Sequence, residues 1–161
     1  MSERETLLQR VERSRKDFDD ENVMISWEEM EQAGLIEERP WKVVIAHIAA
    51  WQAIAFTEIL KVLAGGKTEV DFNDREVVDR MNGVIADFAR TLSGAAAVNW
   101  LYSANQNLVS LISTLDDGQL SEGSVIRNWV VAEAIDHYGE HLPGLRNYVA
   151  ETAEKRRGKK I

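Results

Sequence analysis

The stretch Pro40–Gly66, PWKVVIAHIAAWQAIAFTEILKVLAGG, decides the fold of this chain. It opens with a proline, which suits the first position of a helix, and closes with two glycines, which suit a left-handed helix end. The residues between them are mostly apolar and include no helix breaker. We therefore predict a helix over residues 40–64. At about 1.5 Å per residue it is about 37 Å long, a length typical of helical bundles.

The rest of the chain repeats the helical pattern, in which apolar residues recur every three or four positions. We predict a short helix after Ser26, which has capping-box spacing to Glu29, and a bend or an end at Pro143 within the last long helix. No segment alternates apolar and polar residues as a strand does. The prediction is an all-α fold of four long helices, one of which is reached through an extra helical crossover. The other predicted helices cover residues 3–20, 74–92, 95–115 and 125–152.

Length, charge and apolar content narrow the class of protein. The chain has 161 residues, which suits one domain, placed at residues 1–154, with a basic tail at 155–161 that we predict to be disordered. Nineteen basic and 27 acidic residues give a net charge of −8, which disfavours binding to nucleic acid. The longest apolar run, Val43–Phe56, is shorter than the roughly 20 residues that cross a bilayer. Together with the charged start MSERETLLQR, these features predict a cytoplasmic protein that binds neither nucleic acid nor membrane.

All three histidines lie within predicted helices, on faces that are otherwise apolar. His47 has apolar neighbours three, four and seven positions away, so its ring is expected to point into the core. His137 and His141 are one helical turn apart, so both rings face the same side. The chain has no cysteine, and three imidazoles leave a coordination position of a metal ion open to water or substrate. We predict a divalent metal site at these three residues; hydrogen-bonded core histidines are the alternative.

Five other side chains are candidates near this site. Glu133, one turn before His137, is a candidate catalytic residue that either orients the histidine or acts as a general base; a solvated glutamate on the helix face is the alternative. Aromatic and amide side chains at helical spacing are candidates for lining a pocket beside the ion, although such aromatics are more often ordinary core residues. These candidates are Trp51, Trp100, Asn105 and Tyr138.

Two longer motifs enclose the histidines. WKVVIAHIAAW, Trp41–Trp51, resembles the vlaHiaaW motif in the second helix of the DinB-like (DinB/YfiT) superfamily. IDHYGEHLPGLR, Ile135–Arg146, resembles the HYxEHLPxIR motif in the last helix of the same superfamily. Within it, the chain is most similar to the ClbS/DfsB-like branch. It departs from the pattern at Arg39 and Val43, where relatives usually carry tryptophan and aspartate.

The resemblance implies a four-helix bundle with up-down-down-up connectivity, whose long crossover matches residues 66–94. It also implies that His47, His137 and His141 are metal ligands, and it leaves a homodimer open, since relatives often form one. Members with known activities include thiol-dependent S-transferases and a protein that opens an electrophilic cyclopropane.

From the histidines and this resemblance we expect a metal-binding protein that holds zinc or nickel. We expect it to be a thiol transferase or a hydrolase, in which a low-molecular-weight thiol or water attacks an electrophilic small molecule. The alternative is a non-catalytic bundle that binds a small-molecule ligand or a partner, with structural histidines or a vestigial metal site.

Overall fold

The computed structural model of the protein describes residues 1–158, and these residues form helices joined by turns and loops, without a strand. The all-α prediction is therefore confirmed for the described part of the chain. Five helices precede the last long helical segment: α1 Glu3–Asn22, α2 Trp27–Glu31, α3 Trp41–Leu63, α4 Arg75–Arg90 and α5 Gly94–Thr114. The last segment consists of α6 Val125–Val131, the π-helical turn η1 Ala132–Asp136 and α7 His137–Gly158.

Local sequence signals explain where these helices begin and end. Ser26 caps α2 in a capping box with Glu29, as the spacing predicts. Pro40 directly precedes α3 with an extended backbone, and its missing N–H costs no hydrogen bond there. Gly65 follows the end of α3 with φ of 83°, a left-handed conformation that glycine adopts without strain.

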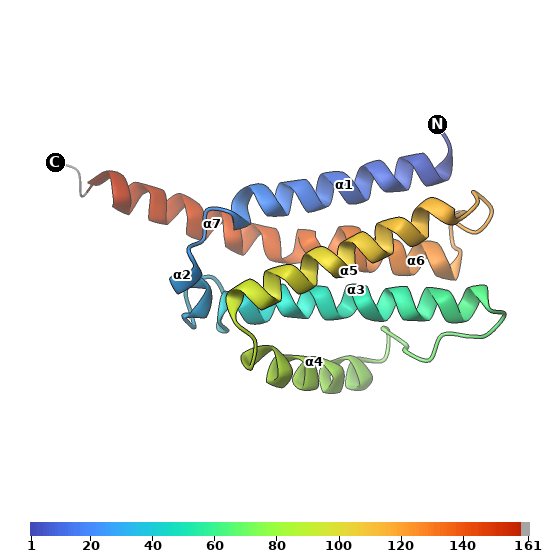
Figure 1. The fold of residues 1–161 in the computed structure, drawn as a ribbon, viewed down its shortest axis with the longest axis horizontal. Helices are drawn as coiled ribbons and strands as arrows, with labels where there is room; N and C mark the ends of the chain where they lie inside the picture. Colours follow the sequence, from blue (N-terminus) through green and yellow to red (C-terminus); the bar gives the residue numbers. More distant parts are fainter. Residues whose placement is uncertain (159–161) are drawn as a thin grey trace.

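Four long helical segments lie side by side, with α4 placed against one of them (Figure 1). The helices α3 and α5 run in the same direction, and α1 and the α6–α7 segment run in the opposite one. Contacts between α3 and α5 are the most extensive in the described chain, and α3 also contacts α4 and α6. The helix α4 forms part of the connection between α3 and α5, and its bounds lie within the predicted helix at 74–92.

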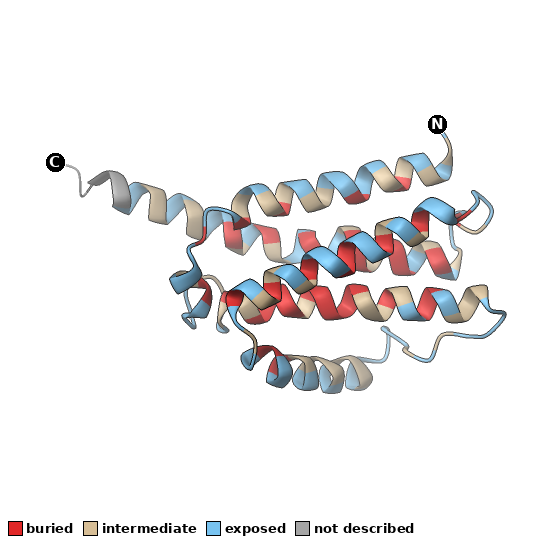
Figure 2. Ribbon diagram, in the orientation of Figure 1, coloured by how far each residue is buried: buried red, intermediate tan, exposed pale blue. Residues whose placement is uncertain are grey.

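The apolar core consists of two clusters that follow one another along the long helices. One gathers around Phe18, Ile45 and Leu101, and the other gathers around Leu7, Ile59 and Leu108. Buried residues are concentrated along α3 and on the inward faces of its neighbours (Figure 2). Among the described helices, α3 is the one long and apolar enough to span a membrane, but 67% of its most apolar window is buried in this structure. A core helix of a bundle passes the same test of length and composition.

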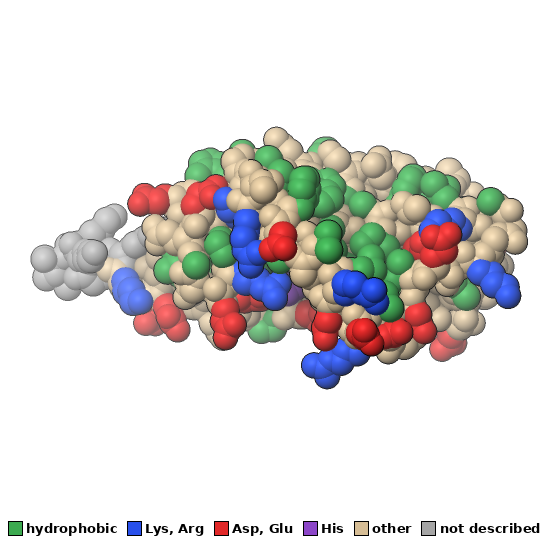
Figure 3. Space-filling view, turned by 90° about the horizontal axis from the view of Figure 1, so that it is seen from below, with side chains coloured by type: hydrophobic (Ala, Val, Ile, Leu, Met, Phe, Trp, Pro, Cys, Tyr) green, Lys and Arg blue, Asp and Glu red, His purple; other side chains and the backbone are tan. Residues whose placement is uncertain are grey.

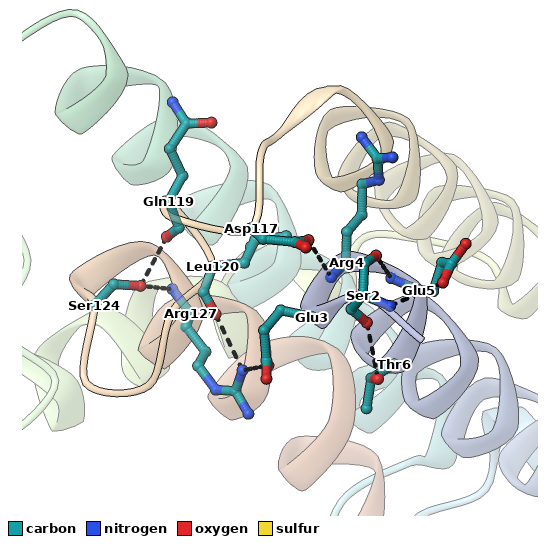
Figure 4. Close-up of polar contacts among 10 residues, drawn as sticks. All are labelled: Ser2, Glu3, Arg4, Glu5, Thr6, Asp117, Gln119, Leu120, Ser124 and Arg127. Atoms are coloured by element: carbon teal, nitrogen blue, oxygen red, sulfur yellow. Dashed lines mark hydrogen bonds and ion pairs between the residues drawn. The ribbon is translucent and has the colours of Figure 1, made fainter.

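Polar contacts join the start of α1 to the loop between α5 and α6 (Figure 4). The backbone N–H of Arg4 donates to Asp117 at 3.1 Å, and the guanidinium of Arg127 pairs with Glu3. Arg127 also donates to the carbonyl oxygen of Leu120 at 3.0 Å. The contacts of Arg4 and Glu3 connect segments more than 100 residues apart in sequence, so they fix the start of α1 beside the loop before α6 and the first turn of α6.

The last helical segment differs from its prediction in two ways. Its interruption is the π-helical turn η1, where the backbone N–H of His137 donates to the carbonyl of Ala132, five residues earlier. Pro143 lies inside α7 and is exposed, so of its two predicted effects, a bend or an end of the helix, the structure excludes the end. The helix also runs on through Gly158, so it includes the first four residues of the predicted tail at 155–161. Residues 159–161 lie outside the described residues.

Candidate metal centre

Three imidazole rings meet between α3 and α7. The centroid of the His47 ring is 4.8 Å from that of His137 and 5.8 Å from that of His141, and the two α7 rings are 5.3 Å apart. One nitrogen of each ring lies within 4.8 Å of the other two. Because a zinc ion binds nitrogen at about 2.0–2.1 Å, small rotations of these rings bring all three nitrogens within reach of one ion.

Two carboxylates hold the α7 histidines through their Nδ1 atoms. Nδ1 of His137 is 2.9 Å from Oε2 of Glu133, and Nδ1 of His141 is 2.7 Å from Oε1 of Glu37. A carboxylate partner on one ring nitrogen keeps a proton there, so the other nitrogen, Nε2, is left free as a ligand. This is the arrangement by which metal-binding histidines are usually oriented.

Two of the histidine nitrogens are buried without a hydrogen-bond partner, which suits the binding of a cation. Nδ1 of His47 and Nε2 of His141 are buried and have no hydrogen-bond partner among the described residues. A buried nitrogen without a partner costs free energy, and a bound ion removes that cost. Burial and the neighbouring rings of His137 and His141 lower the pKa of His47 to about 3. The His47 ring is therefore neutral at physiological pH, as a metal ligand must be.

Two hollows adjoin the histidines and have His47 and Asn82 in common. The first, of about 260 Å³, lies between α3, α4 and η1, and the second, of about 390 Å³, lies beside the segment before α3. We call them together the histidine cleft. Figure 3, which views the side of α4, shows a small patch of histidine at the surface between basic and acidic side chains. The polar and aromatic residues that line the cleft include Glu37, Glu38, Arg39, His47, Trp51, Asn82, Glu133, Asp136, His137, Glu140 and His141.

Apart from the histidines, five of the six charged side chains that line the histidine cleft are acidic. Glu133, Asp136 and Glu140 contribute carboxylates to the first hollow, and Glu37 and Glu38 contribute carboxylates to the second, which also contains Arg39. The hydrogen bond from His141 lowers the pKa of Glu37, so this carboxylate stays ionised. An excess of negative charge in a cleft raises the local concentration of cations.

The structure brings some of the predicted site residues together and separates others. Trp51 lines the first hollow, and its Nε1 donates to Oδ1 of Asn82 at 2.8 Å. Glu133 is buried rather than solvated, and it contacts His137 as an orienting residue would.

Tyr138, Trp100 and Asn105 do not line the histidine cleft, which corrects their prediction as pocket residues beside the ion. Tyr138 follows His137 by one position, a rotation of about 100° on a helix, and its ring packs 5.1 Å from Phe18 on the α1 side. Trp100 stacks edge-on against Phe88 of α4. Asn105 faces α1, where it lines a different hollow.

The sequence analysis did not identify Glu37, Arg39 and Asn82 as residues of the candidate site. Glu37 and Arg39 belong to the irregular segment between α2 and α3, where no periodic pattern indicates which way a side chain points. Asn82 is on α4, and its place beside His47 depends on how the crossover packs. The signal that could have found Glu37 is the need of a metal-binding histidine for a second hydrogen-bond partner.

Comparisons of the chain with models of protein families, with curated proteins and with solved structures found no match. The geometry of the site therefore carries the functional assignment. Three imidazoles of which two are oriented by carboxylates, beside an acidic hollow, suit a divalent cation that keeps positions open for other ligands.

Proposed function

We propose that the chain is a metal-binding protein in which His47, His137 and His141 hold one divalent cation, zinc or nickel. The observation that carries this proposal is the convergence of the three rings, with ligand nitrogens within 4.8 Å of one another and two buried nitrogens without partners. Imidazole nitrogen binds zinc and nickel well, and the order of affinities among divalent metals favours both over manganese and iron.

The arrangement of the helices supports a bundle of the DinB-like type. The parallel pair α3 and α5, the opposite direction of α1 and α7, and the crossover helix α4 give the up-down-down-up order that the two sequence motifs imply (Figure 1). In that family the histidines of the second and last bundle helices are the metal ligands. They correspond here to His47, His137 and His141.

The proposed chemistry is the attack of water or a low-molecular-weight thiol on an electrophilic small molecule. A bound divalent cation supplies Lewis acidity, which makes water or a thiol a better nucleophile at neutral pH. Glu133 and Glu37 orient the histidines, while Trp51 and Asn82 form the wall against which a substrate lies. Asp136 and Glu140 line the same hollow and are placed to accept a proton from a nucleophile there.

The first experiment is elemental analysis of the protein purified without a histidine tag. We expect about one equivalent of zinc or nickel per chain, as one three-histidine site requires. The double variant His137→Ala/His141→Ala should lose the metal, whereas the control Asn82→Ala, which changes the same cleft without removing a ligand, should keep it. A folded protein that holds no metal and takes up neither added ion would support the non-catalytic binding bundle instead.

A second experiment separates an enzyme from a binding protein. Metal-loaded protein is mixed with glutathione and an electrophile such as 1-chloro-2,4-dinitrobenzene, and thioether formation is followed by absorbance. Turnover that disappears in His47→Ala and on addition of a chelator is expected for the transferase. Binding of the electrophile in a stoichiometric amount, unchanged by the chelator, would contradict it.

A further inference from the structure

The segment between α3 and α4, residues 64–74, runs back beneath α3 and brings one aromatic ring to the histidine cleft (Figure 1). The ring is that of Phe72, which lines the first hollow with His47 and His137. Phe72 is 36% exposed, whereas Trp51, the other aromatic side chain of this hollow, is 3% exposed. Among the described residues that line the cleft, Phe72 therefore offers the most apolar surface to a ligand.

A buried carboxylate holds this segment just before Phe72. The side chain of Glu58 on α3 accepts hydrogen bonds from the backbone N–H groups of Glu69 and Val70. Nζ of Lys61 donates to Glu58 at 2.7 Å and to Glu69 at 2.8 Å, so it joins the two carboxylates. Hydrogen bonds to an ionised group are among the stronger ones, so they fix the backbone two residues before the ring.

A turn and an aromatic contact fix the ring itself. Oδ1 of Asp71 accepts from the backbone N–H of Asn73 at 2.9 Å, and the backbone N–H of Asp74 donates to the carbonyl of Asp71 at 3.1 Å. The ring of Phe72 lies edge-on to that of Trp129, with their centroids 4.8 Å apart. Phe72 is thus held in place without a ligand, which lowers the entropic cost of using it for binding.

The other groups of the first hollow restrict the kind of ligand that fits beside this ring. Nε2 of His137 has no hydrogen bond to the described residues and, unlike Nε2 of His141, is not enclosed, so it is open to the hollow. Asp136 and Glu140 line the same hollow, and no lysine or arginine of the described chain does. These carboxylates disfavour an anion, while the ring of Phe72 favours an apolar group.

We propose that Phe72 determines the specificity of the histidine cleft and selects a neutral electrophile that carries an aromatic ring. The ring of the substrate packs against Phe72, which places its reactive carbon on the side of His47 and His137. Aromatic pairs are favoured beyond the apolar area that they bury, so a phenyl group gains more here than an aliphatic group. This inference rests on the proposed function, since it names the class of electrophile for the same site.

The test is alkylation of the full-length, metal-free protein with phenacyl bromide and with bromoacetone. Both are bromomethyl ketones, and they differ in a phenyl or a methyl group. A neutral imidazole nitrogen displaces bromide, forms the N–C bond and passes its ring proton to solvent. The rate at each histidine is followed by mass spectrometry of peptides and divided by the rate for N-acetylhistidine. On this scale we expect phenacyl bromide to react about tenfold faster than bromoacetone at His137.

Variants of Phe72 and one matched control make the result specific. Phe72→Ala should slow phenacyl bromide at His137 about tenfold and leave bromoacetone within about twofold, whereas Phe72→Tyr, which keeps the ring, should retain the preference. If Phe72→Ala does not fold, Phe72→Leu keeps an apolar side chain beside Trp129 and should lower the preference about threefold. The control is Phe88→Ala, because Phe88 is exposed and lies edge-on to Trp100 but does not line the cleft; it should have no effect.

Two outcomes would overturn the proposal. One is an unchanged ratio of the two rates at His137 in folded Phe72→Ala. The other is a wild type that does not prefer phenacyl bromide over bromoacetone on the N-acetylhistidine scale. Because the protein is alkylated without metal, these rates test Phe72 whatever the elemental analysis shows. A protein that binds no metal contradicts the proposed function instead.

Discussion

Replacing Glu133 by glutamine tests whether a carboxylate tunes the proposed metal site. Oε2 of Glu133 is 2.9 Å from Nδ1 of His137, and both side chains are less than a tenth exposed. Glutamine keeps the size of the side chain but removes the charge that holds the Nδ1 proton in place. Loss of such an outer partner weakens metal affinity about 10- to 100-fold, which corresponds to about 1.4–2.7 kcal/mol. We expect a loss in this range for Glu133→Gln.

The assay is competition for zinc between the protein and a chromophoric chelator at neutral pH. Glu140→Gln is the matched control, because Glu140 lines the same hollow on α7 but is exposed and contacts no histidine nitrogen in the described structure. It should bind zinc within about twofold of the wild type, as expected for a screened surface charge. Equal affinities of Glu133→Gln and the wild type, with unchanged circular dichroism, would refute the orienting role of the carboxylate.

Three further predictions concern stability, each measured by urea unfolding. In the wild type, Nε1 of Trp41 donates a buried hydrogen bond to Oδ1 of Asn22 at 2.7 Å. Trp41→Phe removes this donor and should lower the free energy of unfolding by about 1–3 kcal/mol; a smaller decrease would mean that Asn22 finds another partner. Metal-free protein should lose stability as the pH falls from 6.5 towards 3, by at most about 1.4 kcal/mol per pH unit. The cause is that His47 binds a proton in the unfolded state but not in the folded state, where its pKa is lowered to about 3. This dependence of stability on pH should be weaker in His47→Leu, and an unchanged dependence would contradict the lowered pKa. Gly65→Ala should cost about 1 kcal/mol through its φ of 83° alone, since no atom lies within 4 Å of the added methyl group, and a neutral result would show that the turn relaxes.

Much of the fold could be predicted because helix signals are local. The proline before α3, the glycine after it and the capping box at Ser26 act within one turn, so they indicate helix ends within a few residues. The π-helical turn could not be predicted in this way. It depends on tertiary contacts, among them the bond from Nε2 of Gln52 on α3 to the carbonyl of Glu133 at 3.2 Å. Pro143 was the stronger local signal, but the helix accommodates it on its exposed face.

In the candidate site, too, local patterns predicted some features and tertiary contacts decided the others. That His137 and His141 share a face follows from their spacing, and the apolar neighbours of His47 indicate that it points inward. Helical spacing was the only guide to all four predicted pocket residues, and it could not tell Trp51, which lines the cleft, from the three that do not. Tyr138 and Asn105 are buried as polar side chains of a core, but each faces α1 rather than the histidines.

The sequence by itself determined the helical class, the approximate helix ends and the shared face of His137 and His141, because each of these depends on residues within a turn or two of one another. The meeting of His47 with these two rings depends on how α3 packs against the last helical segment. Only the tertiary structure decided which partners the histidines meet. Glu37 reaches His141 across 104 residues, and Asn82 reaches the cleft through the packing of α4 on α3. These partners come from segments far apart in the sequence, so no local pattern could predict them.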